Sequence, residues 1–421
     1  MNLEDKVLLV GADTGENINF ELSMEELGKL AEACNMQVVG SVIQKVWDIN
    51  KAYYIGTGKV AEVKELAISL EADMVIFDNA LSPSQLANLQ DALDIAVMDR
   101  TTLILEIFSS RAKSKEAKLQ VEVARLQYLL PRLTGLGKAL SRQGGASGSK
   151  SSKGAGEKKL ELDRRYLERR LNEMRRELKE VVNQRQTQRK LRDKSGIARV
   201  ALVGYTNAGK STLMNSMLKK YEKEAEKQVF AKDMLFATLD TTVRKIQAPD
   251  RMPVLLSDTV GFIHELPHNL VEAFKSTLEE AVQADLLLQV VDVSDINHKE
   301  QIEVTNHTLA ELGAGHIPLI YVYNKADCVV PTENLPKVQE DKIYISAKEG
   351  VGLDELMELI ENRLSGGYCD CTMLVPYNRG DVVGDLETKG AIRKREYLEE
   401  GTKITVHCTK KDAGKYKEFL I

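Results

Sequence analysis

The stretch ARVALVGYTNAGKSTLMN (198–215) decides the fold of the largest part of this chain. An apolar run typical of a buried strand leads into eight residues with the spacing of a phosphate-binding loop, and a helical pattern follows. Glycines allow the backbone to wrap closely around phosphates, whose charge the backbone N–H groups and the start of the helix stabilise. The motif predicts a nucleoside triphosphate site. Its residues are Gly204, Tyr205, Thr206, Asn207, Ala208, Gly209, Lys210 and Ser211.

Two side chains of this loop have expected roles. Lys210 is expected to reach the β- and γ-phosphates, and the hydroxyl of Ser211 is expected to ligate Mg²⁺. The motif by itself indicates a nucleoside triphosphate and does not select the base.

Three further motifs follow in the order of a guanine-nucleotide site, each at the end of an apolar run. DTVG (258–261) places a carboxylate near the magnesium and a backbone N–H near the γ-phosphate. In NKAD (324–327), Asp327 can accept hydrogen bonds from N1–H and the amino group of guanine, which adenine lacks; such pairing rejects a wrong base by about four to five powers of ten. SAK (346–348) offers a backbone N–H to the guanine oxygen. The residues are Asp258, Thr259, Val260, Gly261, Asn324, Lys325, Ala326, Asp327, Ser346, Ala347 and Lys348.

A switch segment is expected between Ser211 and Asp258, and FATLD (236–240) is the candidate. Switch loops are ordered by contacts to the γ-phosphate and Mg²⁺, so a second hydroxyl ligand is expected there. Thr238 is the favoured ligand, with Thr241 and Thr242 as alternatives. The nucleotide-binding residues expected in this segment are Phe236, Ala237, Thr238, Leu239 and Asp240.

Phe262 follows Gly261 where many guanine-nucleotide hydrolases have a glutamine that orients the attacking water. A phenyl ring cannot orient water. The sequence therefore predicts slow intrinsic hydrolysis that accelerates when a partner orders the switches or supplies polar groups. The expected catalytic residues are Lys210, Thr238, Gly261 and Phe262.

The fold expected of the whole chain is α/β in four parts. Residues 1–108 form a small βαβ domain, 109–196 a basic two-helix arm, 197–365 the nucleotide domain with a mostly parallel sheet, and 366–421 a small α+β domain. The expected strands cover 7–12, 36–43, 73–78, 94–99, 198–205, 254–258, 285–293, 318–324 and 342–346.

Helix starts are marked in the first domain, where helices are expected over 23–34, 59–70 and 82–93. Ser23 lies three residues before Glu26, as in a capping box, and Ser82 precedes a proline. YIGTGKV (54–60) lacks the spacing of a phosphate loop, so a plain turn into a helix is favoured.

Two heptad patterns predict that the arm is an antiparallel helix pair. The apolar positions are Leu119, Val123, Leu126, Leu130 and Leu133, then Leu160, Leu167, Leu171, Met174, Leu178 and Val181. Pro131 is expected to end the first helix. Residues 134–157, rich in Gly, Ser and Lys, are expected to form a flexible basic loop at the tip.

Charge is distributed unevenly. Residues 109–199 carry 25 Lys and Arg against 10 Asp and Glu, in a chain whose net charge is −5. If these basic residues share a face, they form an electrostatic footprint for nucleic acid. The alternative is a solvated helical surface of mixed charges.

Composition excludes several classes of protein. The chain has 421 residues, of which 43% are hydrophobic and 29% charged, as in soluble proteins of more than one domain. No apolar run is long enough to span a membrane, and the start of the chain does not resemble a signal peptide. We expect a cytoplasmic protein.

Five cysteines are too few and too scattered for a disulfide framework. Cys369 and Cys371 form a close pair, with His407 and Cys408 downstream. Metal binding by these residues is one interpretation, and reduced structural thiols are the favoured one.

The residues resemble one family over nearly the whole chain, the HflX GTPases. Besides the nucleotide motifs, the resemblance is carried by YIGTGKV (54–60), VIFDNALSPSQ (75–85), DRTTLILEIF (99–108), EAKLQVE (116–122), LLPRL (129–133), FATLD (236–240) and DTVGFI (258–263). It implies a translation-factor-class GTPase that binds the large ribosomal subunit, reaches ribosomal RNA through the loop of its arm, and splits stalled ribosomes. It also implies Mg²⁺ ligation by Ser211 and Thr238.

One segment departs from that family. Its arm loop usually reads G-P-G-E-T-Q-L-E, whereas this chain has GAGEKKLE (154–161), with two lysines in place of Thr and Gln. The expected protein is a monomeric, GTP-switched, ribosome-stimulated hydrolase. Two alternatives stay open: a signalling or RNA-modification GTPase that dimerises through the arm, and a structural RNA-binding protein with a nearly inert nucleotide domain.

Overall fold

The computed structural model describes residues 5–15, 19–143, 150–193, 196–221, 235–236, 241–248, 251–264, 275–364, 368–388 and 391–421. The chain forms two compact units. Unit 1 holds Met1–Val182 with two short segments of the later chain, Met234–Leu239 and His264–Lys275. Unit 2 holds the rest.

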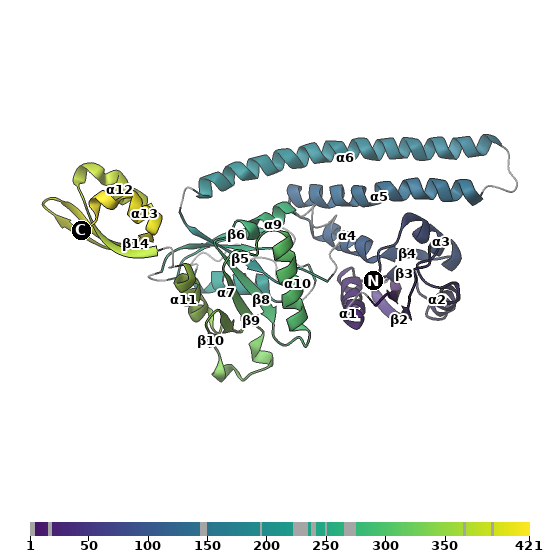
Figure 1. Cartoon of the computed structure of the whole chain (residues 1–421), viewed down its shortest axis with the longest axis horizontal. Coiled ribbons are helices and arrows are strands. Elements are labelled where there is room, and N and C mark those ends of the chain that lie inside the picture. Colours follow the sequence, from purple (N-terminus) through teal and green to yellow (C-terminus); the bar gives the residue numbers. More distant parts are fainter. Residues whose placement is uncertain are drawn as a thin grey trace. The chain divides into compact units, whose positions relative to one another are not determined.

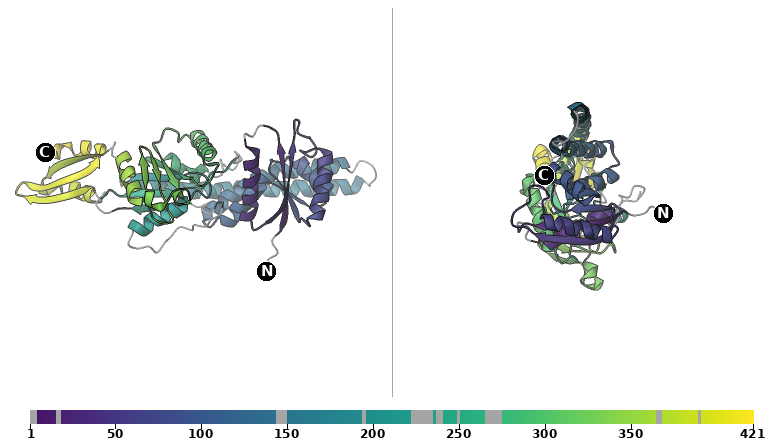
Figure 2. Two further views of the ribbon diagram at one scale, coloured as in Figure 1. Left: turned by 90° about the horizontal axis from the view of Figure 1, so that it is seen from below. Right: turned by 90° about the vertical axis from the view of Figure 1, so that its right-hand side faces the viewer.

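Unit 1 begins with a four-stranded parallel sheet in the order β2-β1-β3-β4. Its elements are β1 (Lys6–Asp13), α1 (Phe20–Ala33), β2 (Gln37–Lys45), α2 (Thr57–Ser69), β3 (Met74–Phe77), α3 (Pro83–Leu93), β4 (Ala96–Asp99) and α4 (Arg100–Arg111). Helices cover both faces (Figure 2). Leu8 and Val10 of β1 pack with α2 and α3, whereas Gly11 faces Phe20 and Met24 of α1. The expected βαβ fold is confirmed.

The expected capping box at Ser23 is wrong. Asn19 caps α1 by accepting from the N–H of Leu22, so Ser23 lies inside the helix. Ser23 is buried, and its hydroxyl donates to Asp78 at 2.7 Å. Glu26 likewise forms an ion pair with buried Arg100. The serine and glutamate that resemble a capping box in the sequence therefore make contacts with distant parts of the fold instead.

The second helix start is confirmed. Ser82 caps α3 with a full capping box to Gln85, and a proline opens the helix. The stretch 54–60 is a turn into α2, whose N-cap is Gly56.

The arm consists of α5 (Lys115–Gln143) and α6 (Lys150–Asp193), which run antiparallel (Figure 1). The ion pairs Lys115–Glu177 and Arg170–Glu122 link residues in opposite chain order. The predicted seam is confirmed in its central part, where Val123, Leu126, Leu130, Leu167, Leu171 and Met174 form one apolar cluster. Leu119, Leu178 and Val181 are partly buried and do not belong to that cluster. The side chains of Leu133 and Leu160 lie outside the described residues.

Pro131 does not end the first helix, because α5 continues through it to Gln143. A proline removes one backbone hydrogen bond. The apolar packing of Leu126 and Leu130, which precede Pro131 in α5, against α6 offsets the loss. The loop expected over 134–157 is correspondingly shorter, since α6 begins at Lys150 and only 144–149 lie outside the described backbone.

Unit 2 contains a seven-stranded sheet in the order β10-β11-β9-β8-β5-β7-β6. Its strands are β5 (Ala198–Val203), β6 (Thr242–Ile246), β7 (Val254–Asp258), β8 (Leu286–Asp292), β9 (Leu319–Asn324), β10 (Lys337–Gln339) and β11 (Lys342–Tyr344). Only the two edge strands, β10 and β6, pair antiparallel. Neither was expected from the sequence, because short polar edge strands lack an apolar run.

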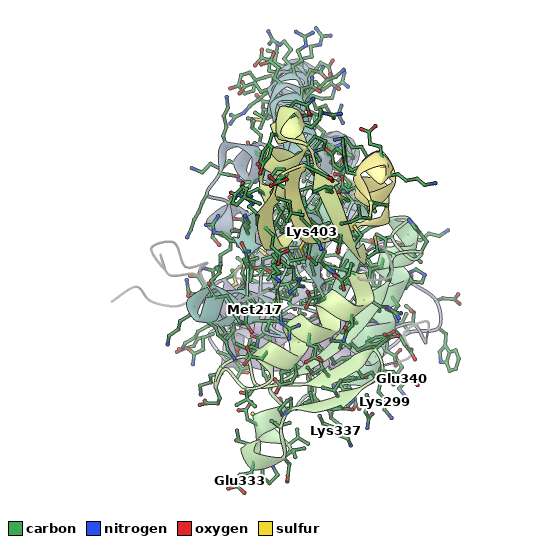
Figure 3. All side chains as sticks on the ribbon, turned by 90° about the vertical axis from the view of Figure 1, so that its left-hand side faces the viewer. Met217, Lys299, Glu333, Lys337, Glu340 and Lys403 are labelled. Carbon is green, nitrogen blue, oxygen red and sulfur yellow. The ribbon has the colours of Figure 1, made fainter. Side chains whose placement is uncertain are left out.

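Helices cover both faces of this sheet. They are α7 (Lys210–Tyr221), α9 (Lys275–Val282), α10 (His298–Glu311) and α11 (Leu353–Leu364). Leu202 of β5 belongs to one core with α7 and α11, in which Met217 is fully buried (Figure 3). Val203, its neighbour on the other face, packs with α9 and α10. The central strand β5 is thus buried on both sides and holds the loop at its end in place.

Unit 2 ends in a small α+β part, as expected. Its elements are β12 (Tyr368–Val375), α12 (Gly380–Thr388), β13 (Ile392–Leu398), β14 (Gly401–Thr409) and α13 (Lys410–Lys415). The strands form an antiparallel sheet in the order β12-β14-β13. Throughout the described ranges, helices that combine the length and the apolarity needed to cross a bilayer are absent.

Candidate nucleotide-binding site

The loop 204–211 connects β5 to α7 in a conformation that depends on glycine. Gly204, Asn207 and Gly209 have positive φ angles of 137°, 61° and 93°. A Cβ on Gly204 would lie 2.3 Å from the carbonyl oxygen of Val290, and one on Gly209 would lie 2.2 Å from the amide nitrogen of Asn324. At Gly204 and Gly209, both the positive φ angle and the lack of space for a Cβ require glycine. The spacing of the two glycines in the sequence follows from this loop conformation.

Lys210 opens α7 and is buried. Its ammonium donates to the backbone oxygens of Gly204 at 2.9 Å and of Tyr205 at 2.7 Å. Burial lowers its pKa to about 8, and the negative charge of Asp258 opposes that shift. A buried cation held by carbonyl groups of the loop is suited to an incoming anion such as a phosphate.

Ser211 and Asp258 come together from two adjacent strand ends. β7 pairs parallel with β5 and ends at Asp258, level with Leu202. The hydroxyl of Ser211 donates to the Asp258 carboxylate at 2.6 Å. Hydroxyl and carboxylate oxygens are hard ligands that Mg²⁺ accepts, so the residues present fit that ion. The neighbouring Thr259 donates instead to the backbone oxygen of Leu202 at 2.7 Å and is fully buried.

Gly261 lies against the loop: a Cβ there would come within 2.9 Å of the Lys210 ammonium and 2.8 Å of the Thr206 Cα. The backbone of the next residue, Phe262, forms hydrogen bonds with the phosphate loop. Its N–H donates to Gly204 at 3.1 Å, and its oxygen accepts from the N–H of Thr206 at 2.8 Å. The side chain of Phe262 is buried in the apolar core that includes Val203.

Asn324 ties two motifs to the phosphate loop. Its amide donates to the backbone oxygen of Ala208 at 2.9 Å and accepts from the N–H of Ala347 at 3.0 Å. The sequence places Asn324 in the nucleotide site but does not predict these two hydrogen bonds. They form because the segments that follow three different strands meet at Asn324. Ser216 of α7 adds a hydrogen bond to the oxygen of Ala347 at 2.5 Å.

The residues predicted to recognise the base follow Asn324. Lys325 has a positive φ of 58° and pairs with Asp292 at 2.7 Å. Ala326 is buried, and Asp327 is half-buried in the short helix Ala326–Cys328. On the neighbouring segment, the Ser346 hydroxyl accepts from the N–H of Glu349 at 3.3 Å. Lys348 is exposed.

The residues of the predicted switch segment are only partly described. Phe236 lies in unit 1, where it is buried and its ring meets that of Phe108 edge to face, with centroids 4.6 Å apart. Ala237, Thr238, Leu239 and Asp240 lie outside the described residues. Thr241 is described, and Thr242 begins β6. Thr238 as a magnesium ligand stays a prediction.

The fold and the site define a P-loop GTPase: a phosphate loop after a buried central strand, a carboxylate beside it, and guanine motifs at two further strand ends. Four family models match the chain: "GTP-binding GTPase N-terminal" at 21–109, "GTP-binding GTPase Middle Region" at 111–192, "50S ribosome-binding GTPase" at 199–325 and "HflX C-terminal domain" at 334–418.

Curated relatives agree with these matches. GTPase HflX of Caldanaerobacter subterraneus subsp. tengcongensis is 44% identical over 401 residues, covering 95% of this chain and 91% of the relative. GTPase HflX of Escherichia coli K12 is 41% identical over 360 residues, covering 84% and 82%. The chain belongs to the HflX family of GTPases. A GTP-binding protein of Sulfolobus solfataricus in complex with GDP is 25% identical and covers 86% of this chain and 99% of its own, with a TM-score of 0.42.

Proposed function

We propose that this GTPase associates with the large (50S) ribosomal subunit when GTP is bound, that the ribosome accelerates its hydrolysis of GTP, and that this cycle splits or rescues stalled ribosomes in the cytoplasm. The observation that carries the proposal is the match of residues 199–325 to a family model described as a 50S ribosome-binding GTPase. The basic arm, with 25 Lys and Arg against 10 Asp and Glu in residues 109–199, supplies a surface suited to ribosomal RNA.

We assign the nucleotide contacts to the residues of the four motifs and to residues 236–240. In this proposal Lys210 neutralises the β- and γ-phosphates, and the N–H of Gly261 faces the γ-phosphate. Mg²⁺, held by Ser211 and Thr238, neutralises charge on the phosphate oxygens. Asp327 selects guanine.

Slow hydrolysis by the protein alone is part of the proposal. Phe262 is committed to the core, so the side chain after Gly261 does not orient water. The partner therefore has to order the switch segment or supply polar groups.

The arrangement of the arm weighs against dimerisation through it. The apolar seam of α5 already packs on α6 of the same chain, with Leu171 only 7% exposed. A second copy would have to displace that packing. We therefore propose a monomer whose arm presents charged side chains outward.

The test is steady-state GTP hydrolysis by the purified protein, alone and with isolated large subunits, small subunits or 70S ribosomes. We expect a rate well below ~1 s⁻¹ alone, slower than ordinary enzymes, and strong stimulation by large subunits and 70S ribosomes only. Lys210→Ala serves as the control for hydrolysis by contaminants. Lack of stimulation by every particle would contradict the ribosomal part of the proposal and leave the GTPase assignment intact.

A further inference from the structure

Three of the five cysteines lie together on one face of the C-terminal sheet. Cys369 and Cys371 are two positions apart on β12, and Cys408 of β14 is the register partner of Cys369. Residues two apart on a strand share a face, so all three side chains point the same way. Their sulfur atoms lie within 4.8 Å of one another, and those of Cys371 and Cys408 are 3.8 Å apart.

The distances between these sulfurs suit a shared metal ion. With a zinc–sulfur bond of about 2.3 Å, two thiolates on a tetrahedral ion lie about 3.8 Å apart. The Cys371–Cys408 separation already has that value, and the sulfur of Cys369 lies within 4.8 Å of both other sulfurs. All three cysteines are free thiols in the structure.

The position of the cluster allows an ion to enter. Cys408 is 1% exposed and belongs to the core of this part, whereas Cys369 and Cys371 are only half-buried at its edge. A purely structural role would favour three fully buried cysteines, since a free cysteine packs as a small apolar residue. Here one ligand is anchored in the core and two line the approach from solvent.

His407 is not part of this set. As the sequence neighbour of Cys408 on a strand, it points to the opposite face, where its ring nitrogen lies 2.7 Å from the carboxylate of Asp370. Lys403 of β14, labelled in Figure 3, is four positions before His407 and therefore lies on the same face of the strand. The candidate ligands are therefore three sulfurs and no imidazole, a soft donor set that selects Zn²⁺ or Cu⁺ over Mg²⁺.

We propose that Cys369, Cys371 and Cys408 bind one thiophilic metal ion as a three-thiolate site, separate from the nucleotide site. Zn²⁺ would keep a fourth position for water, and Cu⁺ would be held by the three sulfurs alone. In either case, the ion would join β12 to β14 and stabilise the C-terminal sheet.

The first experiment is metal titration of the full-length, reduced and metal-free protein under nitrogen, with excess Mg²⁺ present to occupy the nucleotide site. Zn²⁺ and Cu⁺ are each titrated in competition with a chromophoric chelator, and Co²⁺ is used as a spectroscopic substitute for Zn²⁺. We expect one equivalent of at least one of the two ions to bind, with a sulfur-to-cobalt charge-transfer band for Co²⁺. Failure of both ions to bind stoichiometrically would overturn the proposal.

Matched serine variants locate the site. Cys371→Ser should weaken binding at least about tenfold, because even outer-shell changes at metal sites cost that much. Cys34→Ser and Cys328→Ser, which change the other two cysteines, should leave the affinity unchanged. Equal affinity in all three variants would place the ion elsewhere and contradict the proposal.

A third measurement needs no variant. The wild-type protein is alkylated with and without bound ion, and each cysteine is followed by peptide mass mapping. We expect Cys369 and Cys371 to be protected by the ion while exposed Cys328 reacts at the same rate. Unchanged alkylation of Cys369 and Cys371 in the presence of the ion would contradict the assignment even if a Cys371 variant folds poorly.

Discussion

At the scale of single residues, the site depends on Asn324 more than its motif suggests. Its one amide holds Ala208 of the phosphate loop and Ala347 of the guanine-oxygen motif. The nearby Gly209 has no room for a Cβ against that amide. One buried side chain therefore connects the loop expected to bind the phosphates with the segment expected to contact the base.

Replacement of Asp327 tests the selection of guanine. In Asp327→Asn, an amide donor replaces a carboxylate acceptor, so it no longer pairs with the N2 amino group but can donate to the C2 oxygen of xanthine. We expect GTP affinity to fall by about four powers of ten and XTP affinity to rise, measured by calorimetric titration of both nucleotides. If the variant loses both nucleotides while its melting temperature is unchanged, Asp327 does not read the base.

Replacement of Phe262 tests its place in the core. Because its ring is 2% exposed among apolar side chains, Phe262→Ala should destabilise unit 2 by about 3–5 kcal/mol. Denaturant unfolding provides the measurement. Val338→Ala, at a residue that is 46% exposed, is the control and should change stability by less than about 0.5 kcal/mol. A Phe262 variant of unchanged stability would show that the ring is not a core residue.

At the scale of elements, the arm combines an apolar seam with charged outer faces. The pairing of α5 with α6 uses one cluster of aliphatic side chains and ion pairs at its margins. Such marginal pairs between exposed groups contribute little. The stability of the arm therefore rests on the seam.

Two leucines of α6 test this. Leu171 is 7% exposed in the seam, and Leu162 is 64% exposed on the same helix. Leu171→Ala should cost about 2–5 kcal/mol, because it leaves a cavity between the helices, whereas Leu162→Ala should cost less than about 0.5 kcal/mol. Denaturant unfolding followed by far-UV circular dichroism measures both. Equal costs would mean that the two helices do not pack through this seam in solution.

At the scale of the whole molecule, the arm is basic whereas the rest of the chain is acidic. The basic residues of the arm attract a polyanion such as RNA, whereas the acidic remainder of the chain repels it. Affinity for ribosomes should therefore depend steeply on salt and on the charges of the arm.

Arg175 and Arg176 are exposed on α6, and replacing both with Gln tests the charge argument. Each lost phosphate contact should reduce the steepness of the log–log dependence of affinity on salt by about 0.7 to 0.9. Co-sedimentation with large subunits over a range of salt concentrations gives the slope. Lys299→Gln on α10, exposed and outside the arm, is the control. A slope that responds equally to both variants would remove the arm from the interface.

Much of this protein could be predicted from local patterns. The phosphate loop, the guanine motifs, the parallel strands that carry them and the heptad seam are each specified by a few neighbouring residues, because the backbone geometry of a loop and the period of a helix are local properties. The order of these elements along the chain then identifies a guanine-nucleotide fold.

The remaining features were decided by contacts between distant segments. Ser23 reads as a helix cap but is an interior residue bonded to Asp78, and Pro131 reads as a helix end but lies within α5. Cys408 is far in sequence from Cys369 and meets it only through the pairing of β12 with β14. A local pattern fixes what a segment can form, whereas burial and strand pairing, which act between residues far apart in the chain, determine which of those possibilities the folded protein adopts.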